Sequence, residues 1–246
     1  MTIHRVFIID DIQLNQSISL NANASNYLAR VLRLKPGATV ILFNAQEPLG
    51  QYHGQITAVS NRRVEVEITE FEPVENEPPV AINLLQGISK GERMDYTIQK
   101  SVEMGIKSIY PLWMERTTVK LSDENRLQKK LAHWQGVSNS AVEQSGRCTQ
   151  VKVHSPMKFN QIGTLKSELN LLLDPYAEQS LHNLAHIKPK TINILIGPEG
   201  GLTDFEVEQA IGMGFIGVRL GPRILRTETA GLAILSNLQY LWGDYS

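Results

Sequence analysis

The chain has 246 residues, enough for one large domain or two modest ones, and its content of 42% hydrophobic and 20% charged residues is that of an ordinary globular protein. Its formal net charge of −1 lacks the basic excess typical of nucleic-acid binders, so any RNA site must be a local patch. The absence of a long apolar stretch or secretory signal and the single cysteine indicate a cytoplasmic protein with no membrane segment.

Short apolar or alternating runs separated by turn residues dominate the beginning of the chain. One helix, at about residues 24–32, interrupts them, and a small β-barrel-like domain over residues 1–72 is the simplest interpretation. A proline-rich acidic stretch follows and predicts a linker at about 73–79. The predicted strands are RVFII (5–9), TVILF (39–43), QYHGQITAV (51–59) and RRVEVEITEF (62–71).

After the linker, strands alternate with helices, which favours an α/β domain with a mostly parallel sheet over residues 80–246. Met94, Ile98 and Val102 recur every four residues and predict an amphipathic helix over 91–104. A longer helix is expected over 122–144, with Ser122 as its N-cap. The predicted strands are VAINLLQGI (80–88), IKSIYPLW (106–113), VKVH (151–154), LNLLLD (169–174), INILIG (192–197) and GVRLG (217–221).

Two of these strands run into Gly-Pro turns. INILI leads into Gly197-Pro198 and then Gly200-Gly201, and GVRL leads into Gly221-Pro222 and the charged stretch RILRTETA. Glycine adopts backbone conformations closed to other residues and lets a ligand approach the main chain. Ligands of open parallel sheets bind at the carboxyl ends of strands, so the pair of turns favours a binding site over two plain connections.

The segment between the two turns predicts a helix. Thr203 and Glu206 have the spacing of a capping box, and Gly214 is a natural stop. GMGFIG (212–217) matches the dinucleotide-binding pattern, but a helix precedes it and a strand follows, the reverse of a phosphate loop. His182 and His186 lie four residues apart without a third ligand, so we expect a solvated pair and no metal site.

Beyond these patterns, the chain resembles the bacterial 16S ribosomal RNA uridine-N3 methyltransferases, the RsmE family of the SPOUT superfamily. The resemblance implies an α/β protein in which a PUA-like RNA-binding β-barrel (1–72) precedes a SPOUT methyltransferase domain (80–246) with a C-terminal trefoil knot. It also implies S-adenosylmethionine as cofactor, 16S ribosomal RNA of the small ribosomal subunit as substrate, and a homodimer. The matching segments are ARVLRLKPG (29–37), KGERMDYTIQKSVEMG (90–105), ERTTVKL (115–121), EQSGR (143–147), IGPEGGLT (196–203) and LGPRILRTETA (220–230).

The resemblance assigns the two Gly-Pro turns to knot loops that wrap the adenosine of the cofactor. Gly197–Gly201 would form the first loop and Leu220–Leu225 the second, with main-chain groups meeting the polar edge of the adenine. The cofactor-binding residues implied in this way are Leu173, Ile196, Gly197, Pro198, Glu199, Gly200, Gly201, Leu220, Gly221, Ile224, Leu225, Thr227 and Ala230.

Methylation at N3 of uridine places chemical demands on the residues beyond the second turn. Donor and acceptor must be aligned for an in-line displacement, and the N3 proton must leave or the developing anion must be stabilised. Arg226 is expected to stabilise negative charge on the base. Either Glu228 or Glu143 is expected to accept the proton, and the sequence leaves that choice open.

The RNA prediction rests on individual basic residues. ARVLRLK places Arg30 and Arg33 three residues apart, on one face of the helix predicted there, where they would form a phosphate clamp. The expected RNA-binding residues are Arg5, Arg30, Arg33, Lys90, Arg93, Arg116, Lys120 and Arg147.

The last predicted helix, residues 230–242, is apolar around most of its circumference and needs burial on two sides, in a large core or at the dimer interface. Two alternatives to the leading function stay open. One is a SPOUT methyltransferase with another RNA target or acceptor atom. The other is a non-catalytic RNA-binding ribosome-assembly factor, against which the intact LGPRILRTETA argues.

Overall fold

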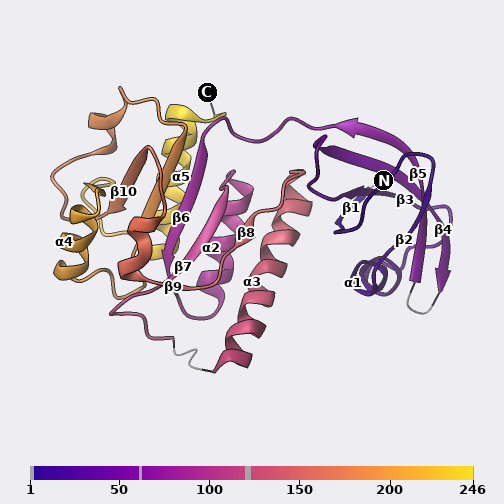
Figure 1. The fold of residues 1–246 in the computed structure, drawn as a ribbon, viewed down its shortest axis with the longest axis horizontal. Helices are drawn as coiled ribbons and strands as arrows, with labels where there is room; N and C mark the ends of the chain where they lie inside the picture. The colour runs from indigo at the N-terminus through magenta and orange to yellow at the C-terminus, as the bar shows by residue number, and fades with distance from the viewer. Residues whose placement is uncertain (1–2, 61–62, 120–122, 246) are drawn as a thin grey trace. The chain divides into compact units, whose positions relative to one another are not determined.

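The computed structural model describes residues 3–60, 63–119 and 123–245 and divides into two compact units (Figure 1). The N-terminal unit comprises Met1–Glu77 and Val142–Gln150, and the C-terminal unit comprises Pro78–Ala141 and Val151–Ser246. The division after residue 77 falls within the expected linker, whereas the segment 142–150, expected in the second domain, clusters with the first. No helix in the described ranges is both long and apolar enough to cross a membrane.

The N-terminal unit is built on a five-stranded sheet in the order β1-β3-β4-β5-β2. β1 runs parallel to β3, and the other neighbours are antiparallel. Val64, Val66 and Ile68 are buried, as their alternation predicted, and join one apolar core with residues of the other strands. The strands are β1 (His4–Phe7), β2 (Ser17–Ser19), β3 (Thr39–Phe43), β4 (Gly50–Ser60) and β5 (Arg63–Pro73).

The helix predicted at 24–32 is less regular than expected and ends at Val31. α1 (Ala22–Asn26) is capped by Asn21 and continues into a π-helical turn, η1 (Tyr27–Val31). The chain leaves the helix at Leu32, and Arg33 adopts a positive φ of 55°. The prediction that Arg30 and Arg33 share a helical face is therefore wrong. The turn is closed by the Leu34 amide, which donates to the Leu28 carbonyl at 3.0 Å while Leu34 packs on the core.

The C-terminal unit contains a parallel sheet in the order β12-β10-β11-β6-β7-β8, with β9 also paired to β7. This confirms the α/β class expected from the alternation of strands and helices. The near-continuous apolar run Ile192–Ile196 is buried because β11 lies inside the sheet. The strands are β6 (Ala81–Gly87), β7 (Ser108–Trp113), β8 (Lys152–Val153), β9 (Met157–Lys158), β10 (Leu169–Leu173), β11 (Thr191–Ile196) and β12 (Ile216–Val218).

A row of three asparagine side chains crosses the middle of this sheet. Asn193 on β11 accepts a hydrogen bond from the Asn83 amide on β6 at 2.9 Å. Its own amide donates to Asn170 on β10 at 2.9 Å and to the Leu165 carbonyl at 2.8 Å. The three residues are direct register partners, so the side chains repeat the pairing of the backbones.

Helices connect these strands. On α2 the residues Met94, Ile98 and Val102 are buried, which confirms the predicted amphipathic helix. The predicted N-cap of α3, Ser122, lies outside the described residues, and His182 but not His186 belongs to the short helix η3, so the two histidines share no α-helical face. The helices are α2 (Glu92–Glu103), α3 (Glu124–Ser145), η2 (Phe159–Thr164), η3 (Leu181–Leu184), α4 (Asp204–Gly212) and α5 (Thr227–Trp242).

α4 begins and ends as its sequence predicts. The Thr203 hydroxyl accepts from the Glu206 amide at 3.2 Å, and the Glu206 carboxylate accepts from the Thr203 amide at 2.9 Å. Gly214, one residue beyond the C-cap, has a φ of +90°. GMGFIG therefore terminates a helix and does not open one.

Candidate functional site

The two Gly-Pro segments leave the parallel sheet at the same edge. β10 lies between β11 and β12, so the first segment follows the strand on one side of β10 and the second follows the strand on the other side. Leu173 ends β10 between them. Three neighbouring carboxyl ends therefore converge, as expected for a ligand site of an open parallel sheet.

The first segment, Gly197–Leu202, is packed tightly at its beginning. Gly197 and Pro198 are buried, and a side chain at Gly87 on β6 would collide with the Pro198 backbone nitrogen. The Gly201 amide donates to the Pro198 carbonyl at 2.8 Å, and Gly201 has a φ of +71°. Glycine is required at position 87 by the close approach and at position 201 by the backbone conformation.

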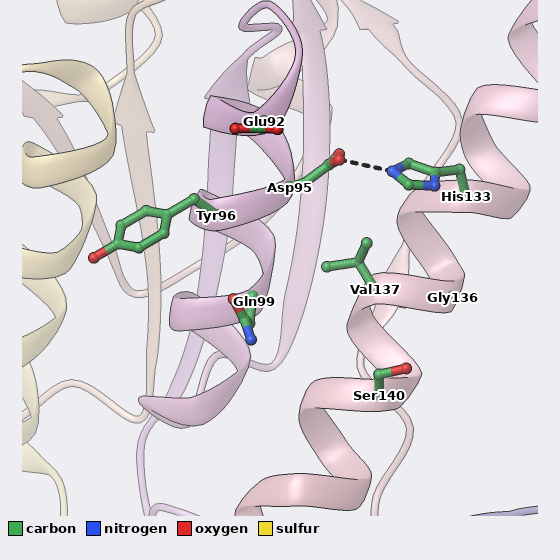
Figure 2. Close-up of a pocket in the computed structure, with 8 residues that line it drawn as sticks. All are labelled: Glu92, Asp95, Tyr96, Gln99, His133, Gly136, Val137 and Ser140. Atoms are coloured by element: carbon green, nitrogen blue, oxygen red, sulfur yellow. Dashed lines mark hydrogen bonds and ion pairs between the residues drawn. The ribbon is translucent and has the colours of Figure 1, made fainter. Parts of the chain in front are cut away.

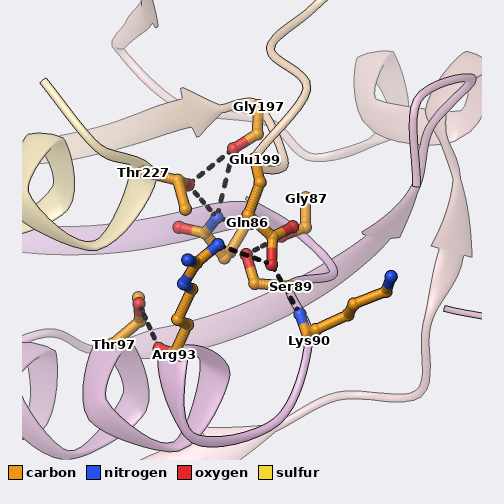
Figure 3. A network of polar contacts seen from close by, with 9 residues as sticks. All are labelled: Gln86, Gly87, Ser89, Lys90, Arg93, Thr97, Gly197, Glu199 and Thr227. Atoms are coloured by element: carbon orange, nitrogen blue, oxygen red, sulfur yellow. Dashed lines mark hydrogen bonds and ion pairs between the residues drawn. The ribbon is translucent and has the colours of Figure 1, made fainter. Parts of the chain in front are cut away.

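A buried polar network joins the first segment to the beginning of α5, two residues beyond the second segment (Figure 3). The Thr227 hydroxyl, at the start of α5, donates to the Gly197 carbonyl at 2.6 Å. The Gln86 side-chain amide, 0% exposed, donates to the Thr227 hydroxyl at 2.9 Å and contacts the carbonyls of Gly197 at 3.4 Å and Gly87 at 3.0 Å. Because the amide nitrogen faces two carbonyl oxygens, the orientation of Gln86 is fixed. Its own oxygen is buried with no hydrogen-bond partner in the described part of the chain.

Glu199 extends this network toward the connection between β6 and α2 (Figure 3). Its carboxylate accepts from the Lys90 amide at 2.8 Å and lies 3.5 Å from the Arg93 guanidinium. Glu199 was expected at the cofactor, and Arg93 at RNA. In the structure these two side chains contact each other, and both hold the first segment against the β6–α2 connection.

The second segment, Leu220–Leu225, is open by comparison. Gly221 has a φ of +76°, and Ile224 is 74% exposed. Apart from the neighbouring Thr227, no described hydrogen bond ties this segment to the first one. An exposed isoleucine beside two converging strand ends offers apolar surface to a flat ligand.

Arg226 and Glu228 stand at the beginning of α5. Arg226 is the exposed N-cap residue, and its guanidinium makes no hydrogen bond or ion pair within the described residues. Glu228 is half-buried, and its Oε2 is enclosed without a partner in the same part of the chain. A cationic group and an under-satisfied carboxylate two residues apart are suited to charge stabilisation and proton transfer.

Glu143 belongs to the N-terminal unit, whereas Arg226 and Glu228 belong to the C-terminal unit. Its carboxylate accepts from the Phe7 amide at 2.9 Å. Burial raises the pKa of Glu143 above its usual range, and that hydrogen bond opposes the rise. The residue is thus tied into the fold of the N-terminal unit.

Two of the basic residues expected at RNA are instead engaged inside the N-terminal unit. Arg147 is only 4% exposed, and its Nε donates to the Glu77 carboxylate at 2.9 Å. Arg5 donates to the Arg147 carbonyl at 2.9 Å and lies over the Phe43 ring at 4.9 Å. A buried, paired guanidinium is poorly placed to bind a phosphate group. Lys120 lies outside the described residues.

The sequence prediction missed Gln86 and Glu206 as parts of this site. Gln86 is the one polar side chain near the end of the buried strand β6, and Glu206 was recognised only as a helix-capping residue. A polar residue inside an apolar strand is the signal that could have identified Gln86, because buried polar groups need partners.

A separate groove lies between α2 and α3 (Figure 2). It has a volume of about 710 Å³ and contains an Asp95–His133 contact of 2.7 Å. No residue of the Gly-Pro segments lines it, and no cluster of potential metal ligands occurs among the described residues. Its lining residues are Glu92, Asp95, Tyr96, Gln99, His133, Gly136, Val137 and Ser140.

Known proteins match the chain over both units. A family model described as an RNA methyltransferase domain matches residues 76–239, and one described as an RNA methyltransferase PUA domain matches residues 20–69. Ribosomal RNA small subunit methyltransferase E of Buchnera aphidicola subsp. Schizaphis graminum is 35% identical over 99% of this chain and 98% of its own. The Bacillus subtilis protein of the same name is 29% identical over 91% and 90% of the two chains.

Solved structures agree with these sequence matches. A putative methyltransferase from Legionella pneumophila, solved with bound S-adenosylmethionine, has a TM-score of 0.93 and 35% identity, covering 99% of this chain and 100% of its own. Ribosomal RNA small subunit methyltransferase E from Neisseria gonorrhoeae, also bound to S-adenosylmethionine, has a TM-score of 0.90 and 36% identity over the whole of both chains.

Proposed function

Because the chain belongs to this family of RNA methyltransferases, we propose that it transfers a methyl group from S-adenosylmethionine to N3 of one uridine in 16S ribosomal RNA of the small ribosomal subunit. The observation that carries the proposal is that the two Gly-Pro segments leave the sheet at one edge, where Gln86 and Thr227 bind the first segment at Gly197. The proposal includes a cytoplasmic location, which fits ribosomal RNA as the substrate. The chain's family, its methyltransferase activity and the use of S-adenosylmethionine, all expected from the sequence, are confirmed by the comparisons.

The residues at the two segments fit the donor. Exposed Ile224 and half-buried Leu225 supply apolar surface for an adenine, and the glycine-rich backbone leaves main-chain groups for its polar edge. Bound there, the donor supplies an electrophilic methyl group on a sulfonium. We retain as cofactor-binding residues Leu173, Ile196, Gly197, Pro198, Glu199, Gly200, Gly201, Leu220, Gly221, Ile224, Leu225, Thr227 and Ala230, with Glu199 acting through its contacts to Lys90 and Arg93.

On the acceptor side, Arg226 stabilises the negative charge that develops on the base when N3 loses its proton. Glu228 accepts that proton in this proposal. It lies two residues from Arg226 and has an enclosed carboxylate oxygen with no partner in the described chain. Glu143 is the second candidate that the sequence left open for the proton, and its carboxylate already accepts a hydrogen bond from the Phe7 amide.

RNA binding is assigned to the PUA domain and to basic residues around the first segment. Arg30 and Arg33 are exposed on the N-terminal unit, and Lys90 and Arg93 are exposed beside Glu199. The trefoil knot and the homodimer belong to the same proposal. α5 supports the dimer because Tyr240 on it is 66% exposed, while Leu232, Leu241 and Trp242 are only half-buried.

Methyl transfer in vitro tests the function. The full-length protein is incubated with donor carrying a labelled methyl group and with small ribosomal subunits, or bare 16S RNA, from a strain lacking the gene. We expect one methyl group per subunit, mapped by nuclease digestion and mass spectrometry to N3 of a single uridine. Subunits from the parent strain, already modified, serve as the control and accept no label. Transfer to another RNA or another atom would identify a different target, and absence of both transfer and donor binding would contradict the proposal.

A further inference from the structure

The loop after β7 contacts the first Gly-Pro segment on a side that the Gln86 network does not reach. Arg116 lies three residues beyond the end of β7. Its Nη1 donates to the Gly200 carbonyl and to the Leu202 carbonyl, each at 3.0 Å. One terminal nitrogen with two N–H groups thus bridges two carbonyl groups of the same turn.

The approach of the two backbones is unusually close. A side chain at Gly200 would place its Cβ 2.9 Å from the Cβ of Arg116 and 3.5 Å from the Arg116 carbonyl oxygen. Real Cβ atoms do not approach this closely, so the β7 loop and the first segment are packed at a distance only glycine permits. The guanidinium contacts are therefore part of a built junction between two backbones.

A second side chain, Glu206, also binds both sides of this junction. Glu206 on α4 is 4% exposed, and its Oε1 accepts from the Glu115 amide at 2.9 Å. Its other oxygen accepts from the Thr203 amide at 2.9 Å. One buried carboxylate therefore joins the residue before Arg116 to Thr203, the residue that follows the first segment. Charge-assisted bonds of this kind are about twice as strong as neutral ones.

From these contacts we propose that Arg116 and Glu206 are positioning residues that hold the first Gly-Pro segment in the conformation that receives the methyl donor. This assignment replaces the RNA-binding role expected for Arg116 and rests on the proposed function. The physical reason is preorganisation. Gly200 and Gly201 make the segment intrinsically flexible, so without an external clamp the donor would have to order it on binding. The two residues act through the loop and not on the reacting atoms.

Calorimetry with S-adenosylhomocysteine on the full-length protein tests the assignment. We expect Arg116→Ala to weaken the affinity about tenfold. The variant loses two hydrogen bonds from a charged donor, and part of that loss is recovered because the ligand can still order the segment when it binds. Arg116→Lys keeps a cation able to reach one carbonyl and should recover part of the loss. Arg126→Ala removes an exposed cation with no contact to the segment and is the matched control. Glu206→Gln retains the shape but places an amide donor against a backbone N–H, and should shift the affinity in the same direction as Arg116→Ala.

RNA affinity, measured on small subunits over a range of salt, separates the positioning role from a phosphate contact. If Arg116 only positions the segment, Arg116→Ala should bind RNA with the wild-type affinity and the wild-type dependence on salt. If Arg116 contacts a phosphate, the variant should bind RNA more weakly and with a smaller dependence on salt. Wild-type affinity for S-adenosylhomocysteine in Arg116→Ala would overturn this inference while leaving the proposed function intact. Failure of the wild-type protein to bind S-adenosylhomocysteine would remove both together. A thermal melt of each variant confirms that the fold is retained before binding is compared.

Discussion

The two Gly-Pro segments follow the same plan in sequence but differ in how the fold holds them. The first is contacted by β6, the β7 loop, α4 and α5, through Gln86, Arg116, Glu206 and Thr227. The second is largely exposed, with Ile224 at 74%. If both segments bind the donor as proposed, the first would be ordered before binding, and the second would supply exposed apolar surface for the donor to cover.

The largest effect is expected at the residue that follows the open segment. Arg226→Ala should lower the rate of methyl transfer about 100- to 1,000-fold, because it removes the charge that stabilises the base anion. Affinity for S-adenosylhomocysteine should stay near the wild-type value, since the guanidinium makes no contact with the first segment. Single-turnover rates and calorimetry measure the two quantities. A comparable rate loss in Arg223→Ala, an exposed arginine within the open segment, would argue against a specific role for Arg226.

The second-largest effect is expected when one carbon is added to the first segment at Gly200. Gly200→Ala forces its Cβ against Arg116 and should destabilise the fold by about 1–3 kcal/mol. It should also weaken S-adenosylhomocysteine binding at least about tenfold, because the first segment is displaced from Arg116. Gly212→Ala is the matched control, since its Cβ would meet no atom within 4 Å and the residue lies in α4. Chemical denaturation and calorimetry of the two variants give the comparison.

Removing the Thr227 hydroxyl, which bonds to Gly197 and Gln86, should lower stability moderately. Thr227→Val keeps the shape but leaves the Gly197 carbonyl and the Gln86 amide without their hydroxyl partner, at a cost of about 1–3 kcal/mol. The melting temperature should fall by several degrees. Thr229→Val changes an exposed threonine of the same helix and should leave the melting temperature almost unchanged. Equal melting temperatures for the two variants would show that the network contributes nothing to stability.

The smallest change in stability is expected within the open segment itself. Ile224→Ala should alter the free energy of unfolding by less than about 0.5 kcal/mol, because the side chain is 74% exposed. Binding of S-adenosylhomocysteine should weaken severalfold, since each methylene group the ligand would have covered contributes about 0.8 kcal/mol. A variant that lost stability without losing affinity would reverse the contrast between the two segments.

The sequence predicted the elements of this site better than their partners. The strand–turn–helix order, the capping box at Thr203 and the stop at Gly214 follow from local patterns, and the structure confirms them. The bond between Gln86 and Thr227 joins residues 141 positions apart and depends on which strands become neighbours. No local pattern encodes that contact.

The basic residues show the same limit more clearly. Arg5, Arg116 and Arg147 were expected at RNA, and in the structure all three side chains contact protein groups. The helix predicted at 24–32 ends at Val31, and Arg33 beyond it has a positive φ, so Arg30 and Arg33 do not share a helical face. Tertiary packing decided these positions, and composition and spacing carry little information about it.

The asparagine row across β10, β11 and β6 has a consequence for how the loops meet. Parallel backbones bond at even intervals, so the ladder alone opposes sliding of one strand past the next only weakly. The hydrogen bonds among the three asparagine side chains fix the register of the three strands, because a shift of one strand would leave a buried amide opposite an apolar side chain. Gly197 follows Asn193 by four residues and Gln86 follows Asn83 by three. The register fixed at the asparagines therefore also fixes the position of Gly197 relative to Gln86. Hydrogen bonds in the interior of the sheet thus determine how the Gly-Pro segments are placed at its carboxyl edge.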